Sequence, residues 1–144
     1  MPKILIDSNL YIHFLRTGAY SESIKALYTF RIRDICFSSV VAEELFQGAL
    51  DIHGKRNVET LLKPFEKVNR IITPTHEDWK EAGLLISKIR TKRRDLSAHL
   101  NRLTHDMLIA LSARRIGAIV YTANQKDFEL ISKFKAFHFE VIQS

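Results

Sequence analysis

Several short apolar runs lie along the chain, and most of them show no alternation with polar residues. Such runs are typical of strands that are buried on both faces, as in a parallel sheet. A last run alternates apolar and polar residues, which favours a strand at the edge of the sheet. The strands are expected at residues 3–7, 34–39, 69–74, 118–122 and 137–142.

Between these runs, apolar residues recur at helical spacing. Thr75 and the acidic residues after it are a helix start signal, and Gly117 is a typical helix end. Pro64 is expected to bend or break its segment. Helices are predicted over residues 9–16, 22–31, 40–50, 56–68, 75–93, 102–117 and 127–134.

Strands and helices thus alternate from one end of the sequence to the other. This order predicts an α/β protein in which helices cover both faces of a mostly parallel sheet. We expect a three-layer α/β/α sandwich with a central sheet of four to five strands. A length of 144 residues suits a single domain, residues 1–144, with its own core.

Composition narrows the class of protein. The chain is 46% hydrophobic and 26% charged, which indicates a globular protein. No apolar run approaches the roughly 18 residues that span a bilayer, so no membrane association is expected. The single cysteine, Cys36, lies in an apolar run and fits a reducing, cytoplasmic setting. A net charge of +6 favours an anionic partner.

Acidic residues follow several of the predicted strands. Asp7 ends the first strand, Glu43 and Glu44 follow the second, and Asp127 follows the fourth, while Asp106 lies near the start of an apolar helix. Because parallel strands all end at one edge of the sheet, these carboxylates should converge. Converging carboxylates repel each other unless cations lie between them, and oxygen ligands select Mg²⁺ or Mn²⁺.

Each acid also has a purely structural interpretation. Asp7 and Asp127 could cap helices, Asp106 could favour the positive end of its helix, and a pair of adjacent glutamates is usually solvated. The coincidence of four sites is what favours a metal centre. No phosphate-binding glycine loop and no zinc-ligand spacing of histidines is present, and His105 is expected to lie at the periphery.

Three stretches in order, ILIDSN, SSVVAEELFQG and THDMLIALSARRIGAIVYTANQKDF, resemble the PIN-domain ribonucleases. The resemblance spans essentially the whole chain and is greatest to the VapC toxins of type II toxin–antitoxin systems. It implies a metal-dependent endoribonuclease that cleaves single-stranded RNA, with Mg²⁺ or Mn²⁺ as cofactor. It also implies an RNA substrate, a cognate antitoxin and a homodimer as partners.

The resemblance assigns roles to individual residues. The catalytic, metal-binding acids would be Asp7, Glu44, Asp106 and Asp127. The residues that hold these carboxylates in place would be Ser8, Asn9, Thr122 and Asn124.

Two features depart from the family pattern. His105 stands where the family often has asparagine, and residues 88–104 form a longer and more basic connection than expected. This connection begins with a cluster of candidate RNA-phosphate contacts, which a solvated helix end would explain equally well. The cluster consists of Lys88, Arg90, Lys92, Arg93 and Arg94.

Two other classes of function remain open from the sequence. The chain could be a PIN-like module that binds metal or RNA without turnover, or a structure-specific DNA nuclease.

Overall fold

The structure, a computed structural model, describes residues 1–143, so residue 144 of the predicted domain lies outside it. Five parallel strands form one sheet in the order β3-β2-β1-β4-β5. The predicted edge strand, β5, does lie at an edge. The strands are β1 (Ile4–Ile6), β2 (Ile35–Ser38), β3 (Ile71–Ile72), β4 (Ile119–Thr122) and β5 (His138–Val141).

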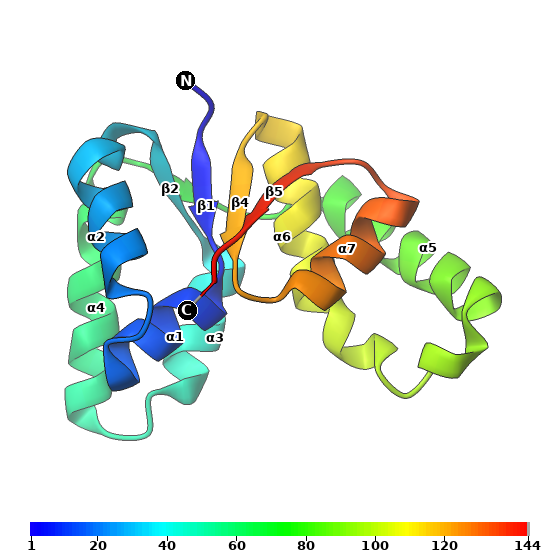
Figure 1. The fold of residues 1–144 in the computed structure, drawn as a ribbon, viewed down its shortest axis with the longest axis horizontal. Coiled ribbons are helices and arrows are strands. Elements are labelled where there is room, and N and C mark those ends of the chain that lie inside the picture. The colour runs from blue at the N-terminus through cyan, green and yellow to red at the C-terminus, as the bar shows by residue number, and fades with distance from the viewer. Residues whose placement is uncertain (144) are drawn as a thin grey trace.

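Helices cover both faces of this sheet, so the predicted three-layer α/β/α architecture is confirmed. Helices α1, α2 and α4 lie on one side, α5, α6 and α7 lie on the other, and α3 lies below the carboxyl ends of the strands (Figure 1). The helices are α1 (Ser8–Thr17), α2 (Ser21–Phe30), α3 (Ser39–Gly48), α4 (Ile52–Lys67), α5 (His76–Lys92), α6 (Leu103–Ile116) and α7 (Gln125–Phe134).

The central strand β1 is fully buried, as its uninterrupted apolar sequence predicts. Leu5 pairs with Cys36 of β2 on one side and with Val120 of β4 on the other. Cys36 is a buried free thiol, which fits its apolar surroundings. No helix within residues 1–143 combines the length and the apolar composition that a membrane span requires.

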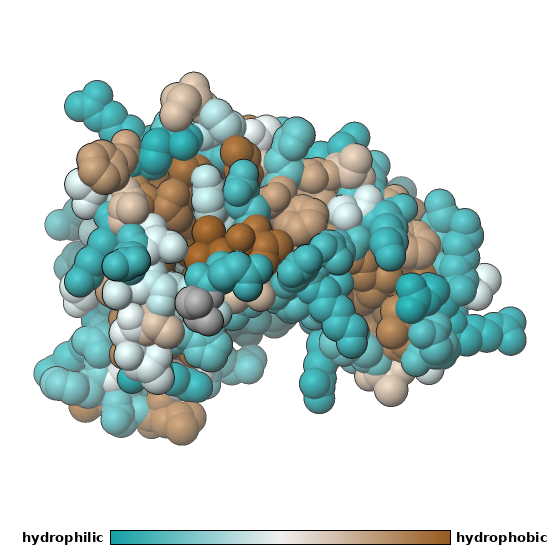
Figure 2. All heavy atoms as spheres, viewed as in Figure 1, coloured by the Kyte–Doolittle hydropathy of each residue, from teal (hydrophilic) through white to brown (hydrophobic). Residues whose placement is uncertain are grey.

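The order of the strands reverses at β1. From β1 the chain builds the sheet outward through β2 to β3, and then returns to add β4 and β5 on the opposite side. In α/β proteins such a reversal opens a crevice at the carboxyl ends of the two strands that flank it. Figure 2 shows the surface hollowed on this side, between the part that contains α1 and α3 and the part that contains α5 to α7.

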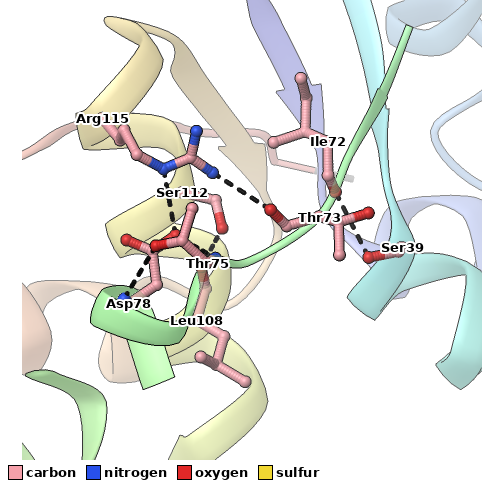
Figure 3. A network of polar contacts seen from close by, with 8 residues as sticks. All are labelled: Ser39, Ile72, Thr73, Thr75, Asp78, Leu108, Ser112 and Arg115. Atoms are coloured by element: carbon pink, nitrogen blue, oxygen red, sulfur yellow. Dashed lines mark hydrogen bonds and ion pairs between the residues drawn. The ribbon is translucent and has the colours of Figure 1, made fainter. Parts of the chain in front are cut away.

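A polar network fixes the connection from β3 to α5 against α6 (Figure 3). Arg115 of α6 donates to Asp78 at 3.1 Å and to the carbonyl oxygen of Thr73 at 3.2 Å. Thr75 and Asp78 form a capping box at the start of α5, which confirms the predicted helix start. The helices on this face of the sheet are therefore held together by charge as well as by packing.

The structure corrects the prediction for residues 56–68. Helix α4 starts earlier, at Ile52, because Asp51 caps it by accepting a hydrogen bond from the amide of Gly54 at 2.7 Å. It also continues through Pro64, so of the two expected effects, a bend or a break, the break does not occur. Pro64 and Thr60, whose carbonyl oxygen loses its helical partner, are both exposed, so water can satisfy that oxygen.

Candidate active site

Asp7 lies between β1 and α1, at the carboxyl end of the central strand, with only 2% of its surface exposed. One carboxylate oxygen accepts from the amide of Ser8 at 2.8 Å, and the other accepts from the hydroxyl of Thr122 at 2.7 Å. Asp7 is thus the N-cap of α1 and is also fixed to the end of β4. The capping and the site interpretations of this residue are therefore compatible.

Asn124 connects two further acids on the opposite side of the crevice. Its side-chain amide donates to Asp127 at 2.9 Å and lies 3.5 Å from a carboxylate oxygen of Asp106. Asn124 is also the N-cap of α7, and its side-chain oxygen accepts from the amide of Asp127. The alternative that Asp127 caps this helix is therefore wrong, and its carboxylate instead accepts hydrogen bonds from other side chains.

The two adjacent glutamates of α3 differ in their surroundings. Glu43 is exposed and accepts a hydrogen bond from Gln47 at 3.1 Å. Glu44 is partly buried, and its Oε2 atom lies 3.7 Å from Nδ1 of His105. The other oxygen, Oε1, is buried and has no hydrogen-bond partner within residues 1–143. Of the two, Glu44 is therefore the glutamate on the side of the other acids.

The pKa values in this cluster reflect both burial and the charges of neighbouring carboxylates. Burial raises the pKa of Asp106 to about 9, with further contributions from the charges of Asp7, Asp127 and Glu44. Burial likewise raises the pKa of Asp7 to about 6, against the lowering effect of the hydrogen bond from Thr122. The pKa of Glu44 is raised mainly by burial. The cluster lacks positive charge, and protons or cations would stabilise it.

The chemistry of these donors fits a hard divalent cation. All four side chains offer carboxylate oxygens, and the buried Oε1 of Glu44 is an acceptor without a donor. No three Asp, Glu, His or Cys side chains within residues 1–143 are already arranged to hold one ion. Each carboxylate oxygen of Asp7 and of Asp127 accepts one hydrogen bond and retains a second lone pair that a cation could use.

Among the supporting residues, Ser8, Thr122 and Asn124 contact the acids directly. Asn9 has a different partner, because its side-chain oxygen accepts from the amide of Ala123 at 3.2 Å. It therefore fixes the loop after β4, and it forms no hydrogen bond with a carboxylate of residues 1–143.

Two histidines lie closer to the acids than the sequence suggested. His105, expected at the periphery, lies beside Glu44. His99, which no motif singled out, has its Nε2 atom 2.8 Å from a carboxylate oxygen of Asp127. His99 belongs to the irregular connection between α5 and α6, where no periodic pattern could indicate its direction.

The basic cluster at the end of α5 does not form one surface. Arg93 lines a cavity together with Asp127, and it also pairs with Asp95 at 3.2 Å. Arg90 and Arg94 line a separate cavity. Lys88 and Lys92 are exposed. Only Arg93 is thus placed next to the acids.

Comparison with known proteins agrees with this architecture. The PIN domain family model matches residues 4–133. A chain of the DNA-bound VapBC from Salmonella typhimurium has a TM-score of 0.71 and 20% identity, with 98% of each chain covered. For FitAcB from Neisseria gonorrhoeae the TM-score is 0.69 at 19% identity, covering 94% of this chain and 95% of the other. For VapBC-1 from nontypeable Haemophilus influenzae it is 0.66 at 17% identity, covering 96% of each chain. No curated protein matches the sequence.

Proposed function

The chain belongs to the PIN domain family, and from this premise we propose that it is a metal-dependent endoribonuclease acting on single-stranded RNA. The observation that carries the proposal is the meeting of four carboxylates at the reversal of strand order, with a buried, unpartnered oxygen on Glu44. An uncompensated cluster of this kind is costly to the fold, and a divalent cation would relieve the cost.

In this proposal Asp7 and Asp106 hold the principal ion, Mg²⁺ or Mn²⁺, and Glu44 and Asp127 complete its surroundings. A bound divalent ion lowers the pKa of water and stabilises charge on the leaving oxygen of a phosphodiester. The protein's own contribution is positioning. Thr122 and the amide of Ser8 fix the carboxylate of Asp7, and Asn124 fixes that of Asp127.

The proposed biological role is that of a toxin neutralised by a cognate antitoxin. The solved structures with this fold include VapBC and FitAB complexes, which supports a protein partner of that kind. A homodimer is part of the same proposal. Overexpression of the chain alone should arrest growth, and co-expression of a cognate antitoxin should relieve the arrest. Unimpaired growth would contradict the toxin role, but it would not test the proposed cleavage of RNA.

The test of the chemistry is cleavage of matched RNA and DNA. End-labelled single-stranded RNA should be cut internally in Mg²⁺ or Mn²⁺, and cutting should stop when EDTA removes the metal. DNA of the same sequence should remain intact. Faster cleavage of DNA would favour the DNA nuclease, and binding of RNA or metal without turnover would favour a module that is not an enzyme.

The contrast between the two glutamates of α3 gives a sharper prediction. Glu44→Gln should lower the cleavage rate at saturating Mn²⁺ by at least about tenfold, or about 1.4 kcal/mol of barrier. Glu44 faces the other acids, whereas Glu43 bonds Gln47 at the surface. The matched variant Glu43→Gln should therefore stay within a few-fold of wild type. A larger loss at Glu43 would show that the wrong glutamate has been assigned to the site.

A further inference from the structure

A cavity of ≈ 380 Å³ adjoins the candidate active site. It lies between α7 and the connection from α5 to α6, and its wall includes Asp127. His99 also lines it and touches Asp127 at 2.8 Å. A molecule in the cavity would therefore lie directly beside the acidic cluster. The lining of the cavity also includes Arg93, Leu96, Lys126, Leu130 and Lys133.

The cavity presents positive charge that the protein leaves uncompensated. Lys126 and Lys133 are exposed, and neither forms an ion pair with any residue in the range 1–143. They lie seven residues apart on α7, which places them on the same face of the helix. Figure 2 shows hydrophilic residues along α7 beside the hollow. Two free lysines on one wall are suited to an anionic group.

The other charged residues of the cavity do not remove its preference for an anionic group. Glu129 and Asp127 also line the cavity and keep their negative charges, and the hydrogen bond that Glu129 accepts at 2.7 Å comes from the neutral amide of Gln125. The three cations Arg93, Lys126 and Lys133 still exceed these two carboxylates by one charge. Arg93 pairs with Asp95, and both side chains are largely exposed, so this pair is weak and Arg93 can turn toward another anion. The cavity thus offers two or three cations at its mouth.

The same cavity also has an apolar wall. Leu96 and Leu130 line it from opposite elements, the α5–α6 connection and α7. Its volume is at the lower end of the range of about 300–1,000 Å³ that small-molecule sites occupy. A group with an anionic part and a flat, partly apolar part of limited size would match both walls.

We propose that this cavity binds one nucleotide of the RNA strand next to the bond that is cut. Its phosphate would contact Lys126, Lys133 and Arg93, and its base or ribose would pack against Leu96 and Leu130. This inference rests on the proposed ribonuclease function and extends it. It gives the strand a defined path, along α7 and into the acidic cluster at Asp127.

The first test removes the two free lysines. The double variant Lys126→Gln and Lys133→Gln should raise the protein concentration for half-maximal single-turnover cleavage at least tenfold. The maximal rate should stay within about threefold, because neither lysine belongs to the acidic cluster. The dependence of this concentration on salt should become shallower by up to about 0.7 in log–log slope, because both lysines are proposed to contact the same phosphate.

A matched control uses two exposed lysines of α4, as Lys63→Gln and Lys67→Gln, which remove the same charge from another helix. This control should behave as wild type. Equal losses in the two double variants would mean that net charge alone matters, and would overturn the inference. Unchanged binding and salt dependence in the α7 variant would also overturn it, with the ribonuclease function intact.

The second test locates the phosphate. Neutral methylphosphonate linkages are placed one at a time on either side of the cleaved bond. In the wild type, one flanking position should weaken binding about tenfold, and the α7 variant should no longer respond at that position. If the neutral linkage and the two lysine substitutions weaken binding additively at every position, the assignment of the phosphate to this cavity is overturned. If the wild type cleaves no RNA with any substrate, the proposed function fails first, and this inference falls with it.

Discussion

Asp7→Asn is expected to slow RNA cleavage by about a thousandfold or more, which corresponds to about 4 kcal/mol of activation free energy. The substitution removes one negative charge from the centre of the acidic cluster. It leaves the shape of the side chain almost unchanged, so the amide of Ser8 keeps its acceptor. Thr122 can exchange the roles of donor and acceptor with the new amide. Initial rates on labelled RNA at saturating Mn²⁺ measure the loss.

The control for this variant is Asp51→Asn. Asp51 caps α4 and lies outside the acidic cluster, and asparagine caps a helix about as well as aspartate. This variant should cleave at the wild-type rate. Thermal unfolding of all three proteins separates loss of chemistry from loss of structure. Wild-type cleavage by folded Asp7→Asn would remove Asp7 from the site.

Asp106→Asn is expected to act on activity and stability in opposite directions. Cleavage should fall by at least about a hundredfold, because the cluster loses a carboxylate that is proposed to hold the principal ion. The metal-free protein, in contrast, should gain about 1 kcal/mol or more of unfolding free energy near pH 8. The gain arises because folding of the wild type at this pH must either take up a proton at Asp106 or bury its charge beside Asp7, Asp127 and Glu44, whereas an amide requires neither.

The direction in which the unfolding free energy changes with pH follows from the pKa of Asp106, which folding raises from 3.8 to about 9. Between these two values the folded state binds more protons than the unfolded state, so the unfolding free energy of the wild type falls as pH rises. Denaturant titrations in EDTA across this range should show that fall, and Asp106→Asn should reduce it. Divalent metal should stabilise the wild type more than the variant. Equal pH dependence in both proteins would contradict this account.

The parts of this fold that could be predicted from sequence are those that depend on local patterns. The uninterrupted run Ile4–Ile6 indicated a doubly buried strand, and Thr75 and Gly117 marked helix ends that the structure confirms. The gathering of Asp7, Asp106 and Asp127 followed from parallel topology alone, because all strands of such a sheet end at one edge. The order of the strands was not needed to predict it.

The parts that could not be predicted depend on tertiary partners. The position of β4 beside β1 is not encoded in any local period, although it creates the bond between Asp7 and Thr122. His99 lies in an irregular connection, where spacing gives no direction to a side chain. Pro64 was expected to bend or break its helix because helix propensity takes no account of tertiary surroundings. The helix is not broken, and the exposed position of this turn makes the missing hydrogen bond tolerable.

The bond between Asp7 and Thr122 joins residues that are 115 positions apart in the sequence. During synthesis, β1 leaves the ribosome long before β4 does. The second neighbour of β1 in the sheet is therefore present only after most of the chain has been made. Long-range parallel pairing of this kind also folds slowly. The acidic cluster is therefore assembled late, after residues 119–127 have emerged. In the proposed nuclease, a chain that has not yet reached these residues would lack the complete cluster.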